Sequence, residues 1–426
     1  MPRHSLPNAI HASGPFLFLN PTTRYHPVSK PPWEQKQEPQ DPGHIVNQAD
    51  REGQEQIYHV WRSRDNRKGR RRVAYLRKQD GGPVKSRTDH YRSQGRKLAL
   101  GVGKMVTRFP VWDVTYLVAV AFVLGSVIWV INGFFVWLPL ARPESEFSGE
   151  TDIAAGILAF LGTTVFEIGS VLMVIEAINA ERSDCFGWEL EEELEDHGLR
   201  LHPRHEGCRH GHQNRQALLR DSAVAMIAAT TVDTVAEPGG LGPDGDEKVK
   251  PEKERRWSWW PTRHELTTHY IKEIGFLASL IQLMGATVFW MAGFTNLPGI
   301  HNAISLPVTN GTYWLPQVVG GTGFIVSSIL LMVEVQDKWY TPAPTMLGWH
   351  VGFWNLVGAI GFTVCGALGF AAEFSTAVEY ASAMSTFAGS WAFLVCSAVQ
   401  WYEALDKYSI SVEDSFPWFA PGEEGV

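Results

Sequence analysis

Four carboxylates lie in stretches of sequence that are otherwise apolar enough to enter a membrane. The stretch GTTVFEIGSVLMVIEAIN, residues 162–179, carries Glu167 at its middle and Glu176 near its end. Glu334 and Glu403 lie at the ends of two later apolar stretches. An ionisable group costs at least a few kcal/mol near the middle of a bilayer and is usually paired or functional there. These four side chains are therefore the first candidates for chemistry.

Three of the four share a position. Glu176, Glu334 and Glu403 each follow a glycine by 14 residues, roughly 21 Å along a helix, which places all three at the same end of their helices. Each is followed three residues later by a further polar side chain, namely Asn179, Asp337 and Asp406. Two interpretations remain open. The glutamates are interfacial anchors that pair with Lys338 or Lys407, or they form a ring that collects cations or binds a cytosolic partner.

Glu167 lies near the middle of its stretch, and the corresponding positions of the later stretches hold Ile325 and Leu394. At a similar depth on another apolar stretch is Gln282. A hydrogen bond between Glu167 and Gln282, with the acid protonated, would satisfy both groups. The alternative is a site for a proton or a ligand.

Residues 197–212, HGLRLHPRHEGCRHGH, concentrate imidazole and thiol groups that can bind Zn or Cu, namely His202, His205, Cys208, His210 and His212. The spacing matches no closed zinc module and only one thiol is present, so a disordered histidine-rich tract is the alternative. The basic run RSRDNRKGRRR, residues 62–72, predicts contact with anionic lipid head groups. A nuclear-import or nucleic-acid tail is disfavoured because the membrane spans follow it.

No phosphate loop, GxSxG, HExxH or paired CxxC motif is present in the sequence. We therefore expect no enzymatic activity, no cofactor and no nucleic-acid partner. The lipid bilayer is the expected environment, and the protein partners are left open.

The apolar residues concentrate in six runs, each long enough to cross a bilayer, which needs about 20 helical residues. They lie near 114–139, 153–178, 271–296, 313–335, 351–372 and 382–403. Residues 1–110 and 181–265 are polar instead, with the composition of segments that cannot offset their ordering entropy. The fold class expected is an all-α membrane protein of six transmembrane helices, with a disordered cytosolic N-terminal region and a long cytosolic loop.

Charge predicts the orientation. Of the 37 lysines and arginines, all but Arg142 fall on one side if the N-terminus is cytosolic. Both termini are then cytosolic, in a multi-pass protein of the endomembrane system or the plasma membrane. The sequon Asn310-Gly311-Thr312 falls in the second outside loop, where it predicts glycosylation at Asn310.

The runs also repeat internally. The pattern G-x3-F-x3-S-x5-E-x2-[ND] begins at Gly162, Gly320 and Gly389, and G-x7-G-F begins at Gly125, Gly285 and Gly361. The unit is a two-helix hairpin present three times, at 111–180, 266–337 and 338–406. Residues 1–110, the loop 181–265 and the tail 407–426 complete the chain. The hairpins form either a pseudo-threefold bundle or a side-by-side row, and small residues on the repeated stripe let helices approach closely.

The hairpin resembles the YrhK-like family of two-helix membrane modules. The residues that carry the resemblance are Gly125, Ser126 and Gly133 with Phe166, Gly169 and Ser170, together with their later counterparts. The resemblance implies a fold and no activity, since that family is uncharacterised. The long polar tail and loop are similar to those of fungal multi-pass proteins.

Two functions remain in view. The first is a transporter or channel for a small solute or ion, with Glu167, Gln282 and the cytosolic-end carboxylates on its path. The second is a non-transporting membrane organiser or adaptor with cytosolic interaction tails. A path requires the carboxylates to face a shared interior, whereas an adaptor does not.

Overall fold

The computed structural model describes residues 11–27, 57–76, 99–180, 186 and 257–413. Six long apolar helices, each long enough to span a membrane, confirm the predicted spans. Their bounds are α4 (Val114–Ala141), α5 (Ala155–Ile178), α9 (Ile274–Thr295), α11 (Leu315–Glu334), α12 (Leu347–Gly369) and α13 (Thr376–Leu405).

Short helical segments lead into two of them. η2 (Glu150–Ala154) precedes α5, and α10 (Leu306–Thr309) with η7 (Asn310–Trp314) precedes α11. Hydroxyl groups within the helices bond back to their own backbone: Ser170 Oγ donates to the Phe166 carbonyl at 2.8 Å and Ser328 Oγ to the Phe324 carbonyl at 2.6 Å. These hydroxyls are therefore satisfied without water, as a hydrocarbon environment requires.

The helices form a closed ring. Each packs on the next in chain order, and α13 returns to pack on α4. This is the bundle alternative and not the row of hairpins. The interior of the ring holds one aromatic side chain from each helix, namely Trp129, Phe166, Phe289, Phe324, Phe362 and Phe393. Several of these rings meet edge to face, such as Trp129 and Phe362 with centroids 4.8 Å apart.

The packing departs from the predicted glycine pattern in one helix. A side chain at Gly125 would meet Phe166 of the next helix. In α12 the glycine that faces Phe393, the counterpart of Phe166, is Gly358. Gly361, the glycine of the predicted pattern, lies against Gly389 instead. Trp129 and Phe362 each follow their glycine by four residues. The glycine of α12 that corresponds to Gly125 in packing is therefore one helical turn earlier than predicted. The threefold repeat itself stays a prediction.

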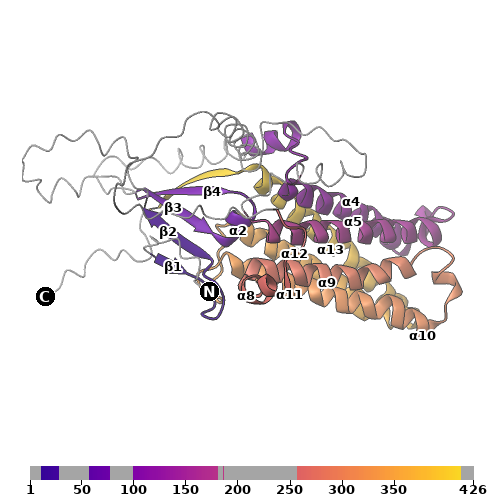
Figure 1. Cartoon of the computed structure of the whole chain (residues 1–426). Helices are drawn as coiled ribbons and strands as arrows, with labels where there is room; N and C mark the ends of the chain where they lie inside the picture. Colours follow the sequence, from indigo (N-terminus) through magenta and orange to yellow (C-terminus); the bar gives the residue numbers. More distant parts are fainter. Residues whose placement is uncertain (1–10, 28–56, 77–98, 181–185, 187–256, 414–426) are drawn as a thin grey trace, which may run out of the picture.

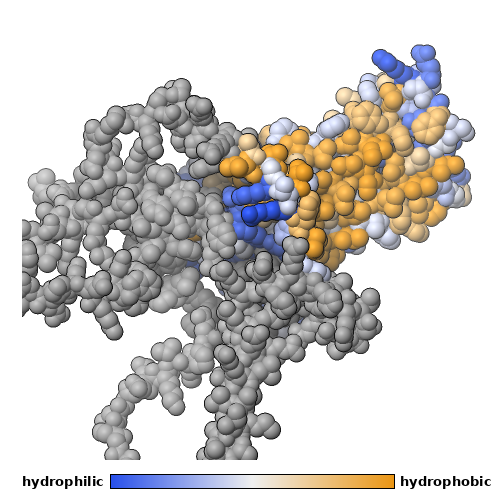
Figure 2. Space-filling model, turned by 90° about the horizontal axis from the view of Figure 1, so that it is seen from above, coloured by the Kyte–Doolittle hydropathy of each residue, from blue (hydrophilic) through white to orange (hydrophobic). Residues whose placement is uncertain are grey.

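The outer surface of the bundle is apolar, as Figure 2 shows for one face, with polar residues gathered at the end away from the sheet. Large side chains point outward along its length, among them Leu124, Ile168, Met284 and Ile329. A broad apolar belt is the surface that a bilayer would cover.

A five-stranded sheet lies at the other end of the bundle, here called the sheet end (Figure 1). Its strands are β1 (His11–Ser13), β2 (Thr23–Pro27), β3 (Ile57–Arg62), β4 (Arg71–Leu76) and β5 (Tyr408–Glu413), in that order. Neighbours are antiparallel except β4 and β5, which are parallel with Arg71 opposite Tyr408. The C-terminal strand thus joins a sheet made from the N-terminal region.

This sheet corrects the expectation that residues 1–110 are disordered, because residues 11–27 and 57–76 are ordered in it. The expectation rested on a low local content of apolar residues. The strands are stabilised instead by pairing with distant segments and by burial of a few side chains, such as Tyr25 and Val60. The same pairing includes part of the tail 407–426, of which Tyr408–Glu413 is β5.

Candidate functional site

The three glutamates that share a sequence position meet at the sheet end. Glu176, Glu334 and Glu403 lie in the last turns of α5, α11 and α13, and their exposed fractions are 0%, 2% and 1%. Since the ring of helices is closed, their side chains share one interior. Three carboxylates buried together require positive partners, because an unpaired buried charge is strongly unfavourable.

The partners come from α2 (Ser63–Arg67), a short helix between β3 and β4. It lies between the sheet and the bundle helices (Figure 1). Gly69 follows it with φ of 60°, a left-handed conformation that glycine adopts without strain, and this turn directs the chain into β4. Arg64, Arg67, Lys68 and Arg70 are all buried.

The arginines bind the glutamates directly. Arg64 Nε and Nη2 donate to the two carboxylate oxygens of Glu403 at 3.0 and 2.7 Å, a bidentate pair. Arg67 Nη2 donates to Glu334 Oε2 at 2.7 Å, and its Nη1 donates to Glu176 Oε2 at 3.5 Å. The α2 segment is therefore held by one glutamate from each predicted hairpin.

Neighbouring groups complete the network. Thr115 Oγ1 donates to Glu176 at 2.7 Å and Ser63 Oγ to Glu334 at 3.1 Å. Arg70 Nη1 lies 2.9 Å from Asp65 and 3.3 Å from Glu403. The buried charges balance: Arg64, Arg67, Lys68 and Arg70 face Glu176, Glu334, Glu403 and Asp65. We call these eight side chains the ion-pair cluster.

Arg64, in α2, and Lys68, directly after it, respond differently to this environment. Burial opposes the charge of Arg64, but the attraction and hydrogen bonds of Glu403, with the attraction of Glu334, raise the pKa of Arg64 above its ordinary value. Burial lowers the pKa of Lys68, and the attraction of Glu176 and Glu403 offsets this only in part. Lys68 Nζ lies 3.6 Å from Glu176, an ion-pair distance without a hydrogen bond. Among the described residues, Lys68 is thus the one cation of the cluster that makes no hydrogen bond to a carboxylate.

This geometry corrects the predicted role of the glutamates. Lys407 binds Asp113 at 2.6 Å instead of Glu403, and Lys338 lies over the Tyr340 ring. The carboxylates are not open to cations either, since the chain's own arginines bind them. Of the polar residues three positions later, Asp406 binds Arg70 at 3.4 Å, Asn179 bonds to Ser258, and Asp337 is exposed.

Part of the basic run at residues 62–72 lies in this cluster. Four of its cations, at positions 64, 67, 68 and 70, are buried against the bundle and are not available to lipid head groups. A run of like charges is normally solvated unless opposite charges are buried beside it. One signal could have found the contact: three glutamates at equal positions in apolar helices, with a compact basic run elsewhere in the chain. Contact of the remaining N-terminal cations with lipid stays a prediction.

Glu167 does not bind Gln282, contrary to prediction. Glu167 is half-buried on the outer side between α5 and α9, where its Oε1 accepts a hydrogen bond from Thr287 Oγ1 at 2.8 Å. Gln282 is buried in the interior instead. The two side chains lie on different faces of the bundle, which counting residues along a helix could not reveal.

This position leads to a prediction for Glu167→Leu. We expect the free energy of unfolding to change by less than about 1 kcal/mol, the range of surface substitutions. The reason is that Thr287 keeps its bond to the Leu283 carbonyl, and the removed carboxylate leaves no buried partner charge. Thermal denaturation in detergent measures the change. A loss of more than about 2 kcal/mol would show that Glu167 supports the bundle.

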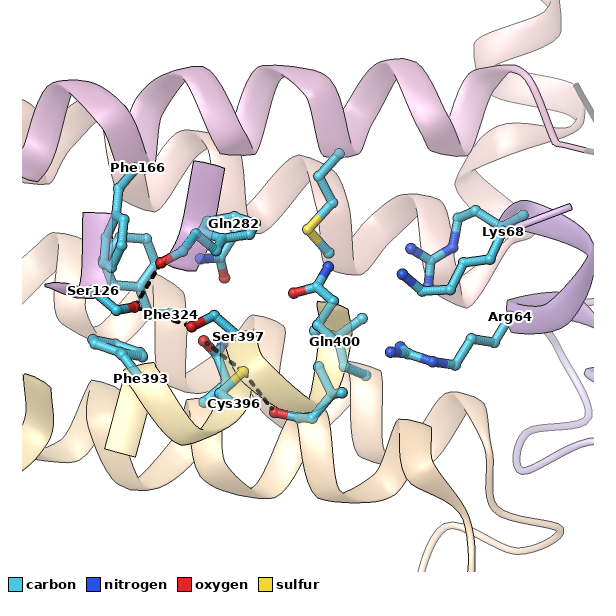
Figure 3. Close-up of a pocket in the computed structure, with 16 residues that line it drawn as sticks. Arg64, Lys68, Ser126, Phe166, Gln282, Phe324, Phe393, Cys396, Ser397 and Gln400 are labelled. Carbon is cyan, nitrogen blue, oxygen red and sulfur yellow. Dashed lines mark hydrogen bonds between the residues drawn. The ribbon is translucent and has the colours of Figure 1, made fainter. Parts of the chain in front are cut away.

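Gln282 lines an internal chamber between α2 and the aromatic interior of the bundle (Figure 3). The space between its lining atoms, part of which is open to solvent, is about 530 Å³, and about 30 Å³ of it is wide enough for the centre of a water molecule. Polar side chains face this space from several helices, among them Ser126, Asn355, Ser397 and Gln400. Among the polar side chains that line the chamber, only Gln282 was predicted from the sequence as a site residue.

The remaining predicted sites are separate from the cluster. Asn310 begins η7 at the end of the bundle away from the sheet, and its Oδ1 is buried. His202, His205, Cys208, His210 and His212 lie outside the described residues. Glycosylation and metal binding at these positions stay predictions.

The fold and the site define a multi-pass integral membrane protein, since six apolar helices form a bundle with an apolar outer surface. Its sheet end carries a buried ion-pair cluster. Comparison with protein-family models, with curated proteins and with solved structures gives no match. The site must therefore be interpreted from its own chemistry.

Proposed function

We propose that this protein is a membrane organiser, whose six-helix bundle holds a sheet module against the cytosolic face of a membrane and presents it to other proteins. The module is the sheet β1–β5 with α2. The observation that carries the proposal is the ion-pair cluster, in which Arg64 and Arg67 bind glutamates of α5, α11 and α13. The charge bias of the sequence supports a cytosolic position for the sheet end.

The physics of buried charge supports a permanent attachment. Separation of α2 from the bundle would leave three carboxylates and four basic groups to be solvated or stranded, and breaking even one buried pair costs roughly 3–5 kcal/mol. Surface ion pairs, by contrast, contribute about 0–1 kcal/mol and weaken in salt. A contact built this way suits an anchor better than a reversible contact with lipid.

The interior of the bundle also favours the organiser function over an open transport path. The glutamates do share an interior, as a path requires, but α2 of the same chain occupies it. On the other side of the chamber the six aromatic side chains fill the bundle. The chamber is thus enclosed between α2 and an aromatic layer.

A chain cut between β4 and α4 provides the test. Strand β5 stays attached to α13, so its pairing with β4 is the same in every variant compared. We would insert a protease site within residues 77–98 of the full-length protein and cleave it in isolated membranes. We expect the N-terminal piece to stay with the membranes in about 0.5 M salt, where charges more than roughly 4 Å apart in water are screened. Sedimentation and immunoblotting measure the retained fraction.

Two charge reversals make the test specific. Glu334→Lys places a positive charge against Arg67 and is expected to release the piece at the same salt concentration. Glu379→Lys makes the same change at an exposed position of α13 and should not. Equal release from both variants, or release from the unmodified protein, would contradict the proposal.

Transport of a small solute or ion is the second candidate, and the chamber is the observation that favours it. Transport would require α2 to leave the bundle mouth. Flux into vesicles that contain the purified protein, with and without Glu334→Lys, distinguishes the two functions, since an organiser shows no flux in either case.

A further inference from the structure

The chamber beneath α2 has formal charge of one sign only. Arg64, Arg67 and Lys68 line it, whereas none of the three glutamates does. Figure 3 shows the ends of Arg64 and Lys68 directed into the space, opposite Phe166, Phe324 and Phe393. The glutamates balance these cations from outside the chamber, so the chamber itself is lined by the positive ends of the ion pairs.

Three buried polar atoms on chamber-lining residues have no hydrogen-bond partner among the described residues. They are Lys68 Nζ, Arg67 Nε and Gln282 Oε1, on side chains that are 1%, 4% and 5% exposed. A buried polar group left without a partner costs roughly 1–3 kcal/mol, and more when it is charged. Occupants of the chamber must therefore include an acceptor for Lys68 and a donor for Gln282.

Helix packing does not require the polar lining. The residue three positions before each of the three glutamates lines the chamber, and these residues are Met173, Leu331 and Gln400. Likewise, the residues three positions before Gly125, Gly285 and Gly358 are Phe122, Gln282 and Asn355. Apolar side chains fill equivalent places in the same bundle. Helix packing thus does not require the amide side chains, because apolar residues could have filled the same positions.

We propose that the chamber binds one small monovalent inorganic anion, of the size of a halide or nitrate ion, between Lys68 Nζ and the amide groups of Gln282 and Gln400. An anion accepts a hydrogen bond from Lys68, and each amide offers N–H donors. A water molecule beside the anion donates to Gln282 Oε1. The wide part of the chamber has room for two or three water-sized bodies, because one needs roughly 10–15 Å³ by this measure.

The electrostatics agree with this occupant. Burial lowers the pKa of Lys68, so an adjacent anion would stabilise a charge that Glu176 and Glu403 compensate only in part. A cation in the chamber would meet Arg64, Arg67 and Lys68, and no carboxylate is among the lining residues. The inference does not rest on the organiser function, because an anion at this position would serve an anchor or a transporter alike.

The test is the anion dependence of thermal unfolding. Full-length protein in detergent is heated in sodium chloride, bromide or nitrate, and in sodium gluconate at equal ionic strength, since gluconate is too large for the chamber. We expect an unfolding temperature higher by roughly 5 °C in the small anions at saturation. A bromide ion in the chamber, located by anomalous scattering from crystals, would be the direct result.

Three variants connect the effect to the chamber. Gln400→Leu introduces the side chain that α11 has at the equivalent position, Leu331. We expect this variant to weaken the apparent anion affinity about tenfold and to leave the unfolding temperature in gluconate unchanged. Lys68→Met should abolish the anion effect. Met173→Leu changes an apolar lining residue and should keep it.

The proposal is overturned if chloride and gluconate give the same unfolding temperature. It is also overturned if Gln400→Leu retains the full anion effect, since the anion then acts at the surface. Because Gln400 makes no ion pair, its variant remains informative even where Lys68→Met fails to fold. Crystals that show only water in the chamber at high bromide would contradict it too.

Discussion

Replacing Glu403 by leucine is expected to raise the rate of amide hydrogen exchange in residues 60–70 by a factor of roughly 100 to 1,000. The substitution leaves Arg64 buried without its bidentate partner and removes one of the three carboxylates at Arg70. Breaking a buried ion pair by removing one partner costs roughly 3–5 kcal/mol. Hydrogen exchange followed by mass spectrometry measures the opening of α2 separately from that of the bundle helices.

A second substitution shows whether the loss comes from the unpaired charge. Arg64→Met combined with Glu403→Leu removes one charge of each sign, so we expect the double variant to exchange more slowly than Glu403→Leu alone. A coupling of roughly 0.5–3 kcal/mol is typical of residues in one ion-pair network. Glu379→Leu, at an exposed position of α13, is the matched control. Additive effects of the two substitutions would mean that Arg64 and Glu403 do not act as a pair.

The second large effect is expected for Gly320→Leu, which should lower the free energy of unfolding of the bundle by about 3 kcal/mol or more. Even a Cβ atom at Gly320 would lie 2.7 Å from the Gly285 carbonyl oxygen and 2.9 Å from the Phe289 nitrogen. Both are backbone atoms, which cannot rotate aside. Overpacking of a well-packed interior typically costs about 1–3 kcal/mol, and a leucine here must separate α9 from α11.

Two comparisons make this prediction specific. At Gly162 the nearest atoms belong to the Trp129 indole, a side chain that can shift, so Gly162→Leu should cost less than Gly320→Leu. Val171→Leu, on a side chain that is 41% exposed on the outer face, should be tolerated. Thermal denaturation in detergent ranks the three variants. Equal unfolding temperatures for Gly320→Leu and Val171→Leu would show that this face of α11 does not set the packing.

The sequence identified one half of the candidate site. Equal spacing from a glycine placed Glu176, Glu334 and Glu403 at one end of their helices, and the structure brings all three to one interior. Their partners were missed, since Arg64 and Glu403 are 339 positions apart. No local pattern records a pair at that separation, and a compact basic run by itself predicts a solvated surface.

Glu167 and the glycines show a second limit. Position along a helix follows from counting residues, which is how Glu167 and Gln282 were paired in the prediction. Rotation about the axis relative to neighbours does not follow, so Glu167 lies between α5 and α9 while Gln282 faces the chamber. In α12 the spacing G-x7-G fits both Gly361 with Gly369 and Gly358 with Gly366. Only the structure shows that Gly358, and not Gly361, packs against Phe393.

The sequence by itself determined the six membrane spans, because the cost of burying polar groups in hydrocarbon forces about 20 apolar residues into each helix. It also determined which end of the second, fourth and sixth spans, now α5, α11 and α13, carries a carboxylate. The tertiary structure decided what those carboxylates bind, where Glu167 points, and that strands at residues 11–76 pair with one another and with β5. These outcomes depend on which distant segments meet. Burial then sets the energy of each charge, since a group that is solvated in isolation becomes a strong partner only where water is excluded.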